Sequence, residues 1–458
     1  MIGSRVKTEF DCRFACKVAA LRLVSWRMVR NPWLLSLVLA IPLTARELPP
    51  LPAELSAYVL TEFTEPAGLQ LKKGDRLAIC GDSITEQKQY SVLVETYLTA
   101  CLPELDITCR QYGWSGEQAS GFLGRMESDV LRFKPTIATT CYGMNDFRYV
   151  PYNEDIAAEY RKNLTTVVDA FKSINCRVVL GSSGIIDSVP HWVKSASGTK
   201  EELNLALSKF RNICVVVAKA EGVSFADLYR PMLIANHVAK QQHGPDFKVS
   251  GKDGVHPAWA GQVIMAYGFL KGMGVGGDIG SVSYDEATGK AEAANGHEVL
   301  STDNGSIKLR STRLPFSPGP GVRDKDDSIR AGMTLVPFDD ELNRFTFTLK
   351  SPKAANYTLQ WGDQSRTYTA AQLTAGINLA KDFENHPLVP AFKKIQDAVA
   401  KKQSYETRQI KQLVHGPEGK ADLDGTFAAT EKERAPLEQA VIQAKQPAEH
   451  VITLTAAP

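Results

Sequence analysis

The feature that most constrains the fold is an alternation of short apolar runs with longer amphipathic ones, from residue 76 to about residue 274. Strands that are apolar almost throughout are buried on both faces, and strands that alternate with helices favour a parallel sheet covered by helices on both sides. We therefore expect an α/β domain, with helices at 90–102, 122–133, 156–174, 203–220 and 260–270. Its expected strands lie at 77–80, 107–112, 136–142, 178–181 and 223–228.

After residue 278 the pattern changes to apolar residues that alternate with polar ones, separated by Gly, Pro, Asn and Asp clusters. This pattern is typical of short antiparallel strands and predicts a small β-sandwich-like module. Met333–Val336 and Phe345–Leu349 are two of its expected strands. Two polar helical stretches follow at 390–413 and 429–445, and Val451–Leu454 is expected to return to the module as a closing strand.

With 458 residues the chain is longer than one ordinary domain, so we expect two folded units and a leader. The predicted parts are a leader at 1–45, an N-terminal linker at 46–75, an α/β domain at 76–277, a β-sandwich-like module at 278–380 and a helical extension with the closing strand at 381–458.

The leader has the pattern of a secretory signal peptide. Arg30 precedes an apolar run at Trp33–Leu43, and small residues follow, with a cleavage site expected after Ala45. The run is too short to span a bilayer as a mature helix, so we expect no stable membrane insertion after cleavage. Met28 is an alternative start of the protein. In the other interpretation residues 1–27 belong to the signal peptide, which then has a long n-region. We expect the protein to be exported, to the periplasm or the outside of the cell.

Composition excludes some partners. The formal net charge of +2, with 43% hydrophobic and 23% charged residues, is ordinary for a soluble globular protein and gives no reason to expect nucleic acid. The cysteines show no zinc-type spacing. We expect neither a metal nor a cofactor. In an oxidising compartment Cys101 and Cys109 could form a disulfide, with buried free thiols as the alternative. The sequence sets no oligomeric state.

Four short motifs, far apart in the sequence, carry the chemistry. Ser83 stands between the first expected strand and the first helix, where a hydroxyl can project over the carboxyl end of the sheet. Taken alone it could equally be a helix N-cap. The motifs are Gly81–Thr85, Ser115–Glu117, Gly143–Asp146 and Asp253–Pro257.

The last motif supplies a base for the serine. His256 lies in a loop bounded by Gly and Pro, three residues after Asp253, and a short loop allows that carboxylate to orient the imidazole. A surface turn is the alternative interpretation. Asn145 and Gly116 each follow an expected strand and can donate hydrogen bonds to a developing oxyanion, although both are also common turn residues.

Together the four motifs resemble the blocks of SGNH/GDSL-family hydrolases, over about residues 77–274. The resemblance implies a flavodoxin-like three-layer α/β/α fold and a carboxylic-ester hydrolase that works through a serine nucleophile, Ser83. It implies that Asp253 and His256 are the orienting acid and the general base. The backbone N–H of Ser83 would form the oxyanion hole together with Gly116 and Asn145.

One departure from the family pattern lies in the segment Gln111-Tyr112-Gly113, where many members carry an asparagine before the glycine. This chain has Gln111 instead. It puts the hydrogen bonding around Gly113 in doubt. Trp114, Phe147 and Arg148 adjoin the motifs and are candidates for lining an acyl or sugar pocket, with packing at the rim as the alternative.

An exported protein of this kind is similar to bacterial carbohydrate O-acetylesterases, so the expected substrate is an acetylated glycan. A lipase, lysophospholipase or thioesterase of the same fold is the alternative among enzymes. A glycan-binding surface protein, with the β-module as the binding part, is the alternative from another class. A third interpretation, which we prefer to carbohydrate binding, is that the β-module only covers one edge of the catalytic domain.

Overall fold

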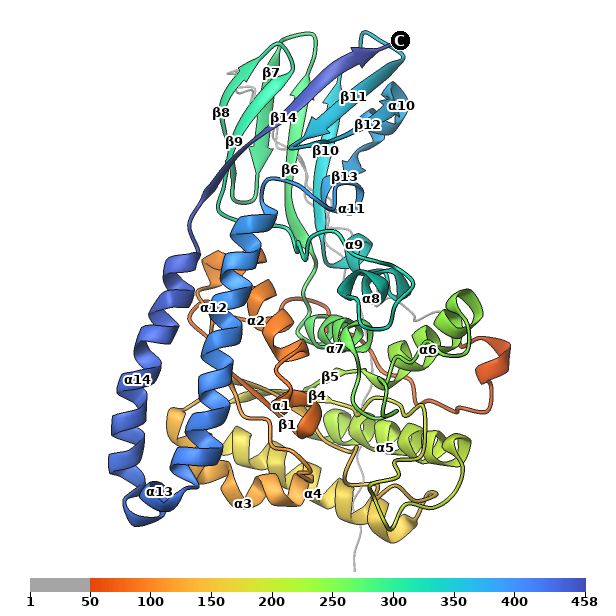
Figure 1. Cartoon of the computed structure of the whole chain (residues 1–458), viewed down its shortest axis with the longest axis vertical. Coiled ribbons are helices and arrows are strands. Elements are labelled where there is room, and N and C mark those ends of the chain that lie inside the picture. Colours follow the sequence, from red (N-terminus) through yellow and green to blue (C-terminus); the bar gives the residue numbers. More distant parts are fainter. Residues whose placement is uncertain (1–49) are drawn as a thin grey trace, which may run out of the picture. The chain divides into compact units, whose positions relative to one another are not determined.

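Figure 1 shows the computed structural model of the chain, which describes residues 50–458. The predicted leader at 1–45, with its cleavage site after Ala45 and the alternative start at Met28, lies outside the described residues. Between residues 50 and 458 no helix is both long and apolar enough to cross a membrane.

The predicted parallel sheet is present, and its strand order is β2-β1-β3-β4-β5. All four pairs of neighbouring strands run parallel. This is the flavodoxin-like order. The strands that follow β2 are added on the other side of β1, and this change of side leaves a crevice at the carboxyl ends of the strands. The strands are β1 (Arg76–Gly81), β2 (Thr108–Gln111), β3 (Ile137–Cys141), β4 (Arg177–Gly181) and β5 (Ser224–Ala226).

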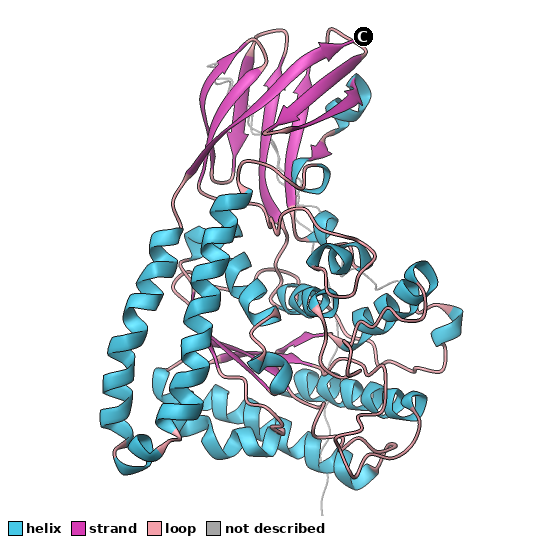
Figure 2. Cartoon of the chain, viewed as in Figure 1, coloured by secondary structure: helices cyan, strands magenta, loops and turns pink. Residues whose placement is uncertain are grey.

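Helices cover both faces of this sheet, which confirms the expected three-layer α/β/α domain (Figure 2). The helices of one layer are α3 (Ala119–Asp129), α4 (Glu154–Ser173) and α5 (Lys200–Glu221). The opposite layer contains α2 (Tyr90–Cys101) and α7 (Trp259–Gly272), with α6 (Tyr229–His243) beside α7. The expected amphipathic helix at 156–174 corresponds to α4, whose apolar face is buried at Ala157, Tyr160, Leu164, Val167, Val168 and Phe171.

The β-rich region contains two sheets, and Val451–Leu454 lies in the predicted closing strand. The four-stranded sheet has the order β13-β10-β6-β7, from β6 (Asp278–Asp285), β7 (Lys290–Ala294), β10 (Arg344–Lys350) and β13 (Ile377–Asn378). The five-stranded sheet has the order β12-β11-β14-β9-β8, from β8 (His297–Asp303), β9 (Ser306–Ser311), β11 (Asn356–Trp361), β12 (Gln364–Thr369) and β14 (Ala448–Ala457).

Two expectations for this region were wrong. β6 and β10 pair in parallel, although we expected antiparallel strands only. Met333–Val336 is not a strand, because all but its last residue belong to helix α8 (Ile329–Leu335), which packs against α7. Gly332 allows this close packing, since a Cβ there would lie 2.4 Å from the carbonyl oxygen of Ala260. Helix α9 (Phe338–Glu341) follows, then α10 (Ala370–Ala375) and α11 (Leu379–Asp382).

The C-terminal helices close the edge of the parallel sheet at β2. Helix α12 (Val389–Arg408) packs on α2 and β2, and α14 (Leu423–Ala444) packs on α12. A π-helical turn at Gln409–Val414 and the short helix α13 (Pro417–Ala421) connect them. These helices cover the β2 edge of the sheet.

Side chains of these helices bind the outward backbone groups of β2. The N–H of Gln111 donates to the Glu406 carboxylate at 3.0 Å, and the carbonyl of Cys109 accepts from Lys402 Nζ at 2.6 Å and from Arg434 at 3.1 Å. An edge strand with unpaired backbone groups invites association with other chains, and these bonds remove that hazard.

The ammonium of Lys402 is fully buried in this interface. It lies 2.6 Å from a Glu95 carboxylate oxygen, 3.3 Å from one of Glu438 and 3.5 Å from one of Glu406. Burial by itself lowers the pKa of Lys402, but the three carboxylates outweigh burial and hold the pKa above its ordinary value. The lysine is therefore a permanent cation at the centre of the contact between α12 and the α/β domain.

The disulfide that we considered between Cys101 and Cys109 is absent, and both residues are buried free thiols. Burial raises the pKa of each thiol well above its ordinary value. A buried thiol that stays protonated is a poor nucleophile, so these cysteines act as small apolar residues of the core.

Candidate active site

The turn that carries Ser83 is built from the residues around it. Strand β1 ends at Gly81, and the short helix α1 (Ser83–Glu86) begins two residues later. The Asp82 side chain caps this helix by accepting a hydrogen bond from the N–H of Ile84 at 3.0 Å. A Cβ at Gly81 would lie 2.1 Å from the Thr85 hydroxyl, so only glycine fits where the strand turns into the helix.

The structure brings Ser83, His256 and Asp253 together in one line of hydrogen bonds. Ser83 Oγ lies 2.8 Å from His256 Nε2, and His256 Nδ1 lies 2.7 Å from Asp253 Oδ2. The other Asp253 oxygen accepts hydrogen bonds from the N–H groups of Val255 and His256, each at 2.9 Å. Burial alone would raise the pKa of Asp253, but these hydrogen bonds outweigh it and lower the pKa.

An ionised Asp253 only accepts hydrogen bonds, so Nδ1 of His256 carries the proton and Nε2 presents its lone pair to the hydroxyl of Ser83. This arrangement allows the imidazole to take the hydroxyl proton when the serine attacks an ester. The side chains of His256 and Asp253 are 23% and 36% exposed, so the centre is open to solvent.

The amide of Asn145 lies between the other two motifs. Its Nδ2 is 3.1 Å from the carbonyl oxygen of Glu117, the residue after Gly116, and 3.3 Å from Asp82 Oδ2, next to Ser83. Gly116 has a φ of +76°, a conformation that favours glycine. Ser83 is the first residue of α1, where backbone N–H groups have no partner within the helix. The predicted oxyanion donors therefore lie around the same turn.

Two buried carboxylates that the sequence analysis did not select support these donors. Glu117 binds the Arg125 guanidinium through two contacts of 2.6 Å and accepts from the Tyr142 hydroxyl at 2.9 Å. Asp146 accepts hydrogen bonds from the N–H groups of Gly143 and of the first residue of α3, both at 2.9 Å. Burial raises the pKa of Asp146 to about 6. Each acid directly follows a predicted oxyanion residue in the sequence, and this position was the signal that could have identified it.

Asp82 is a third buried carboxyl group at this turn, and it is 1% exposed. Burial raises the pKa of Asp82 to about 7, and the nearby carboxylates of Asp146 and Glu117 add to the shift. The charge next to Asn145 therefore changes near neutral pH.

Gln111, the departure from the family pattern, has a defined structural role. Its amide donates to the carbonyl of Thr85 at 2.7 Å and accepts from the Thr407 hydroxyl at 3.0 Å. It thus connects the turn after Ser83 to helix α12. The neighbouring Gly113 is packed tightly, since a Cβ there would lie 2.3 Å from the N–H nitrogen of Glu86.

The three candidates for the pocket wall differ in position. Trp114 is half-buried, with Lys411 Nζ 5.1 Å from the centre of its ring, so one face of the indole already has a partner. Phe147 is 1% exposed and packs in the core, which leaves it no surface for a substrate and corrects our expectation. Arg148 is exposed and forms an ion pair with Glu159 of α4.

Trp192 is an aromatic residue that the sequence analysis missed. Its ring lies 6.0 Å from the imidazole of His256, at an interplanar angle of 26°, and the side chain is 43% exposed. The residue belongs to the long loop that follows β4, at the carboxyl end of the sheet. That position was a usable signal, because ligands of such sheets bind outside the carboxyl ends of the strands.

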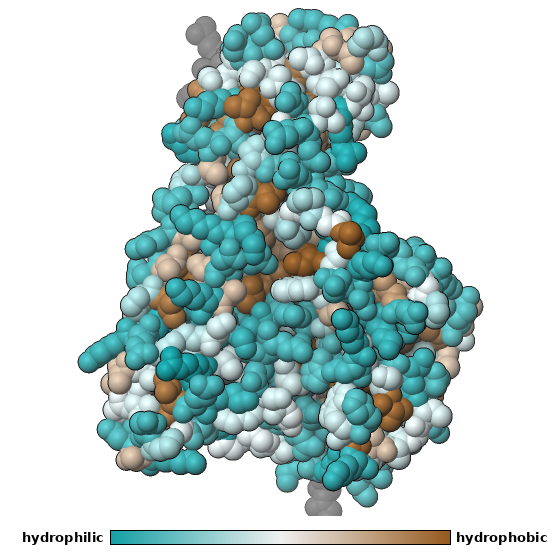
Figure 3. Space-filling model, in the orientation of Figure 1, coloured by the Kyte–Doolittle hydropathy of each residue, from teal (hydrophilic) through white to brown (hydrophobic). Residues whose placement is uncertain are grey.

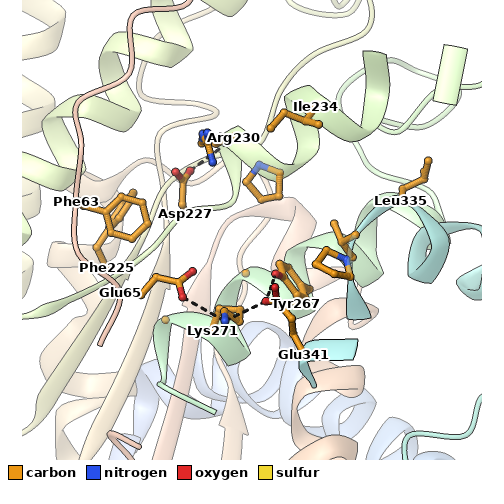
Figure 4. A pocket seen from close by; sticks show the side chains of 15 residues that line it. Phe63, Glu65, Phe225, Asp227, Arg230, Ile234, Tyr267, Lys271, Leu335 and Glu341 are labelled. Carbon is orange, nitrogen blue, oxygen red and sulfur yellow. Dashed lines mark hydrogen bonds and ion pairs between the residues drawn. The ribbon is translucent and has the colours of Figure 1, made fainter. Parts of the chain in front are cut away.

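A separate pocket of about 230 Å³ lies beside β5, α6 and α7 (Figure 4). Apolar side chains such as Phe63 and Phe225 form much of its wall. Its charged groups bind each other, since Lys271 Nζ lies 3.2 Å from a Glu65 oxygen and 3.1 Å from a Glu341 oxygen. None of Ser83, His256 and Asp253 lines it, so this pocket is separate from their line of hydrogen bonds.

Comparison with known proteins agrees with this geometry. The sequence model of the GDSL-like Lipase/Acylhydrolase family matches residues 79–264, a segment that holds all four motifs. An acetylxylan esterase from Geobacillus stearothermophilus is 24% identical over 221 residues, which are 45% of this chain and 97% of that protein. The solved structure of a gut microbial diltiazem-metabolizing enzyme is similar over 84% of this chain and 98% of its own, with a TM-score of 0.68 and 23% identity. That likeness shows a shared fold that extends beyond the α/β domain.

Proposed function

Because residues 79–264 belong to the GDSL-like lipase/acylhydrolase family, we propose that this carboxylic-ester hydrolase is an exported O-acetylesterase that removes acetyl groups from a carbohydrate. The observation that carries the proposal is the hydrogen-bonded line from Ser83 through His256 to Asp253, with distances of 2.8 and 2.7 Å. We propose these three residues as the nucleophile, the general base and the orienting acid.

In the first step, Ser83 Oγ attacks the ester carbonyl carbon while His256 Nε2 takes the hydroxyl proton. The carbonyl oxygen becomes an oxyanion, which the N–H groups of Ser83 and Gly116 and the amide of Asn145 stabilise. The carbon–alkoxy bond then breaks, and His256 gives the same proton to the leaving alcohol oxygen. This leaves an acetyl group on Ser83.

In the second step, a water molecule gives a proton to His256 Nε2 as its oxygen attacks the acetyl carbon. The bond between that carbon and Ser83 Oγ breaks, and the serine recovers the proton from His256. Acetic acid leaves and releases its remaining proton to solvent to give acetate, so one water is consumed for each ester. Throughout both steps the Asp253 carboxylate stabilises the positive imidazolium that forms transiently.

Two observations support a carbohydrate substrate. The relative that is 24% identical carries the name acetylxylan esterase, and its similarity covers 97% of that protein. The catalytic side chains are also accessible, with His256 23% and Asp253 36% exposed. An open centre of this kind suits an ester on a bulky chain better than a deep apolar tunnel would.

The proposal of export rests on the leader, where Trp33–Leu43 forms the apolar core of a signal peptide and Ala45 precedes the expected cleavage point. Expression of the full chain and N-terminal sequencing of the mature protein in the periplasm or medium test this part. A protein that stays in the cytoplasm and begins at Met1 or Met28 would contradict it.

The main experiment measures acetate release from a panel of acetylated oligosaccharides, with long-chain acyl esters and acyl thioesters as comparison substrates. We expect release from at least one oligosaccharide and little hydrolysis of the long-chain substrates. Preference for long acyl chains would instead favour a lipase or thioesterase. Glycan binding without hydrolysis would favour a surface binding protein.

The variant Ser83→Ala tests the nucleophile. We expect activity on oligosaccharides and on a short aryl ester to fall at least about 10³-fold, because no acyl intermediate forms without the hydroxyl. Ser173→Ala is the matched control, since it removes an exposed hydroxyl at the end of α4. Full activity in Ser83→Ala would refute the assignment.

A further inference from the structure

The indole of Trp192 is more exposed than those of the other tryptophans in residues 50–458. On the face shown in Figure 3 hydrophilic residues predominate, and large apolar side chains are mostly buried in the described chain. At the described positions, Trp361 is fully buried and Trp114 and Trp259 are half-buried, whereas Trp192 is 43% exposed. An aromatic ring that stays open to water beside a catalytic histidine offers an apolar face to a ligand.

The loop that carries Trp192 is attached to the loop of the catalytic acid and base. The N–H of Asp187 donates to the carbonyl of Gly254 at 2.8 Å, and the Ser188 hydroxyl donates to the carbonyl of Asp253 at 3.1 Å. Gly254 has a φ of +78°, and a Cβ there would lie 2.6 Å from the Ser188 nitrogen. The two loops are therefore in direct backbone contact.

Residues of α6 also bind Asp187, near the start of the loop that carries Trp192. The carboxylate of Asp187 is buried and accepts from Asn236 at 2.9 Å and from the N–H of Ser250 at 3.1 Å, and it forms an ion pair with Lys240. Since Asp187 is fixed in this way, the loop leaves the sheet on a rigid stem. The stem from which the indole extends toward His256 is therefore fixed by the fold before any substrate binds.

The mechanism shows which part of the substrate meets this indole. His256 Nε2 returns its proton to the leaving alcohol oxygen, so the alcohol part of the ester must lie on the imidazole side of Ser83. Trp192 stacks against that same imidazole, with ring centres 6.0 Å apart. In an acetylated carbohydrate the alcohol part is the sugar, whose C–H face packs well on an aromatic ring.

We propose that Trp192 is the binding platform for the sugar ring that bears the acetyl group, and that it determines the preference for carbohydrate esters over esters of small alcohols. This inference rests on the proposed deacetylation of carbohydrate. The acetyl group itself does not touch the indole. The platform therefore acts in substrate binding, and it has no role once the sugar has left and Ser83 carries the acetyl group.

The test compares Trp192→Ala with the wild type on an acetylated oligosaccharide and on ethyl acetate, whose alcohol is too small to reach the indole. We expect KM for the oligosaccharide to rise about tenfold, because one aromatic stacking contact is lost, and we expect kcat to change less than twofold. We expect kcat/KM for ethyl acetate to stay within about twofold. Trp192→Phe is expected to recover most of the affinity, and Val451→Ala, which alters a residue 40% exposed on β14, is the control.

Activity on ethyl acetate also shows that the variant is folded. An equal loss of kcat on both substrates would overturn the platform, because it would mean that Trp192 only holds His256 in place. An unchanged KM for the oligosaccharide would also overturn it. A wild type that releases no acetate from any carbohydrate would instead refute the proposed function, and the platform with it.

Discussion

Lowering the pH from 8 to 5 is expected to destabilise the β-rich region, because three of its histidines are buried and neutral. His297, His386 and His450 are 6%, 4% and 4% exposed. The Trp361 indole donates to His450 Nδ1 at 3.0 Å, and the imidazole of His386 stacks on the same indole at 4.1 Å. An indole N–H can only donate, so His450 Nδ1 must stay unprotonated for this bond to exist.

The size of the effect follows from the pKa values. Burial lowers the pKa of His386 and His450 to about 3 and that of His297 to about 4. An unfolded histidine has a pKa of about 6.5, so at pH 5 the unfolded chain binds nearly one proton at each position and the folded chain binds almost none.

Because these pKa values are depressed in the folded protein, the stability is fully present above about pH 6.5 and is lost as the pH falls toward the folded values. At pH 5 the loss is about 2 kcal/mol for each histidine, or about 6 kcal/mol for the three. That is a large part of the roughly 5–15 kcal/mol by which folded proteins are stable.

The variant His386→Gln isolates one of these groups. We expect it to be less stable than the wild type at pH 8, because the stacking on Trp361 is lost, and to show a deficit about 2 kcal/mol smaller at pH 5. Urea unfolding followed by circular dichroism at both pH values measures the difference. Other titrating groups are common to both proteins and cancel. His191→Gln, which removes an exposed imidazole, is the control. A deficit of the same size at both pH values would refute the reasoning.

Three further predictions concern the catalytic turn and the helices beside it. Asn145→Ala is expected to lower kcat on an aryl ester about 10²- to 10³-fold with little change in KM, and an unchanged kcat would exclude it from the oxyanion hole. Lys402→Met leaves the buried Glu95 carboxylate without its cation and is expected to lower the free energy of unfolding by about 3–5 kcal/mol. A urea midpoint equal to that of the wild type would contradict this. Gly113→Ala places a Cβ 2.3 Å from the Glu86 nitrogen, so kcat and Tm should both fall, and a fully active variant would show that the turn can shift.

The α/β domain could be predicted well because its signals are local. Runs such as Leu77–Cys80 are apolar on both sides of the strand, which already requires a sheet between two layers. The apolar face of α4 also appears in the sequence as residues spaced at helical intervals. The β-rich region was harder, since Met333–Val336 is short and apolar and fits a strand or a buried helix equally. The contact of α8 with α7 decided the outcome, and only the folded chain contains that contact.

The residues of the candidate site also differ in whether the sequence could predict them. Ser83, Asp253 and His256 were predictable because their motifs have the turn chemistry and the order of a known family. Trp192 was not selected, because its only signal in the sequence is its place after an expected strand, and its importance comes from the imidazole 6.0 Å away. Phe147 was misjudged for the opposite reason, because proximity to a motif in sequence did not place it at the surface.

The sequence by itself predicted the ester-hydrolase chemistry of this protein, together with the serine, the histidine and the aspartate that we propose as its catalytic residues. Only the tertiary structure decided what surrounds that chemistry. The C-terminal helices are far in sequence from the β2 edge that they cover, since Lys402 and Cys109, which are in contact, lie 293 residues apart. Such long-range contacts depend on complementary charge and shape between distant segments, and no local pattern encodes which segment will meet which.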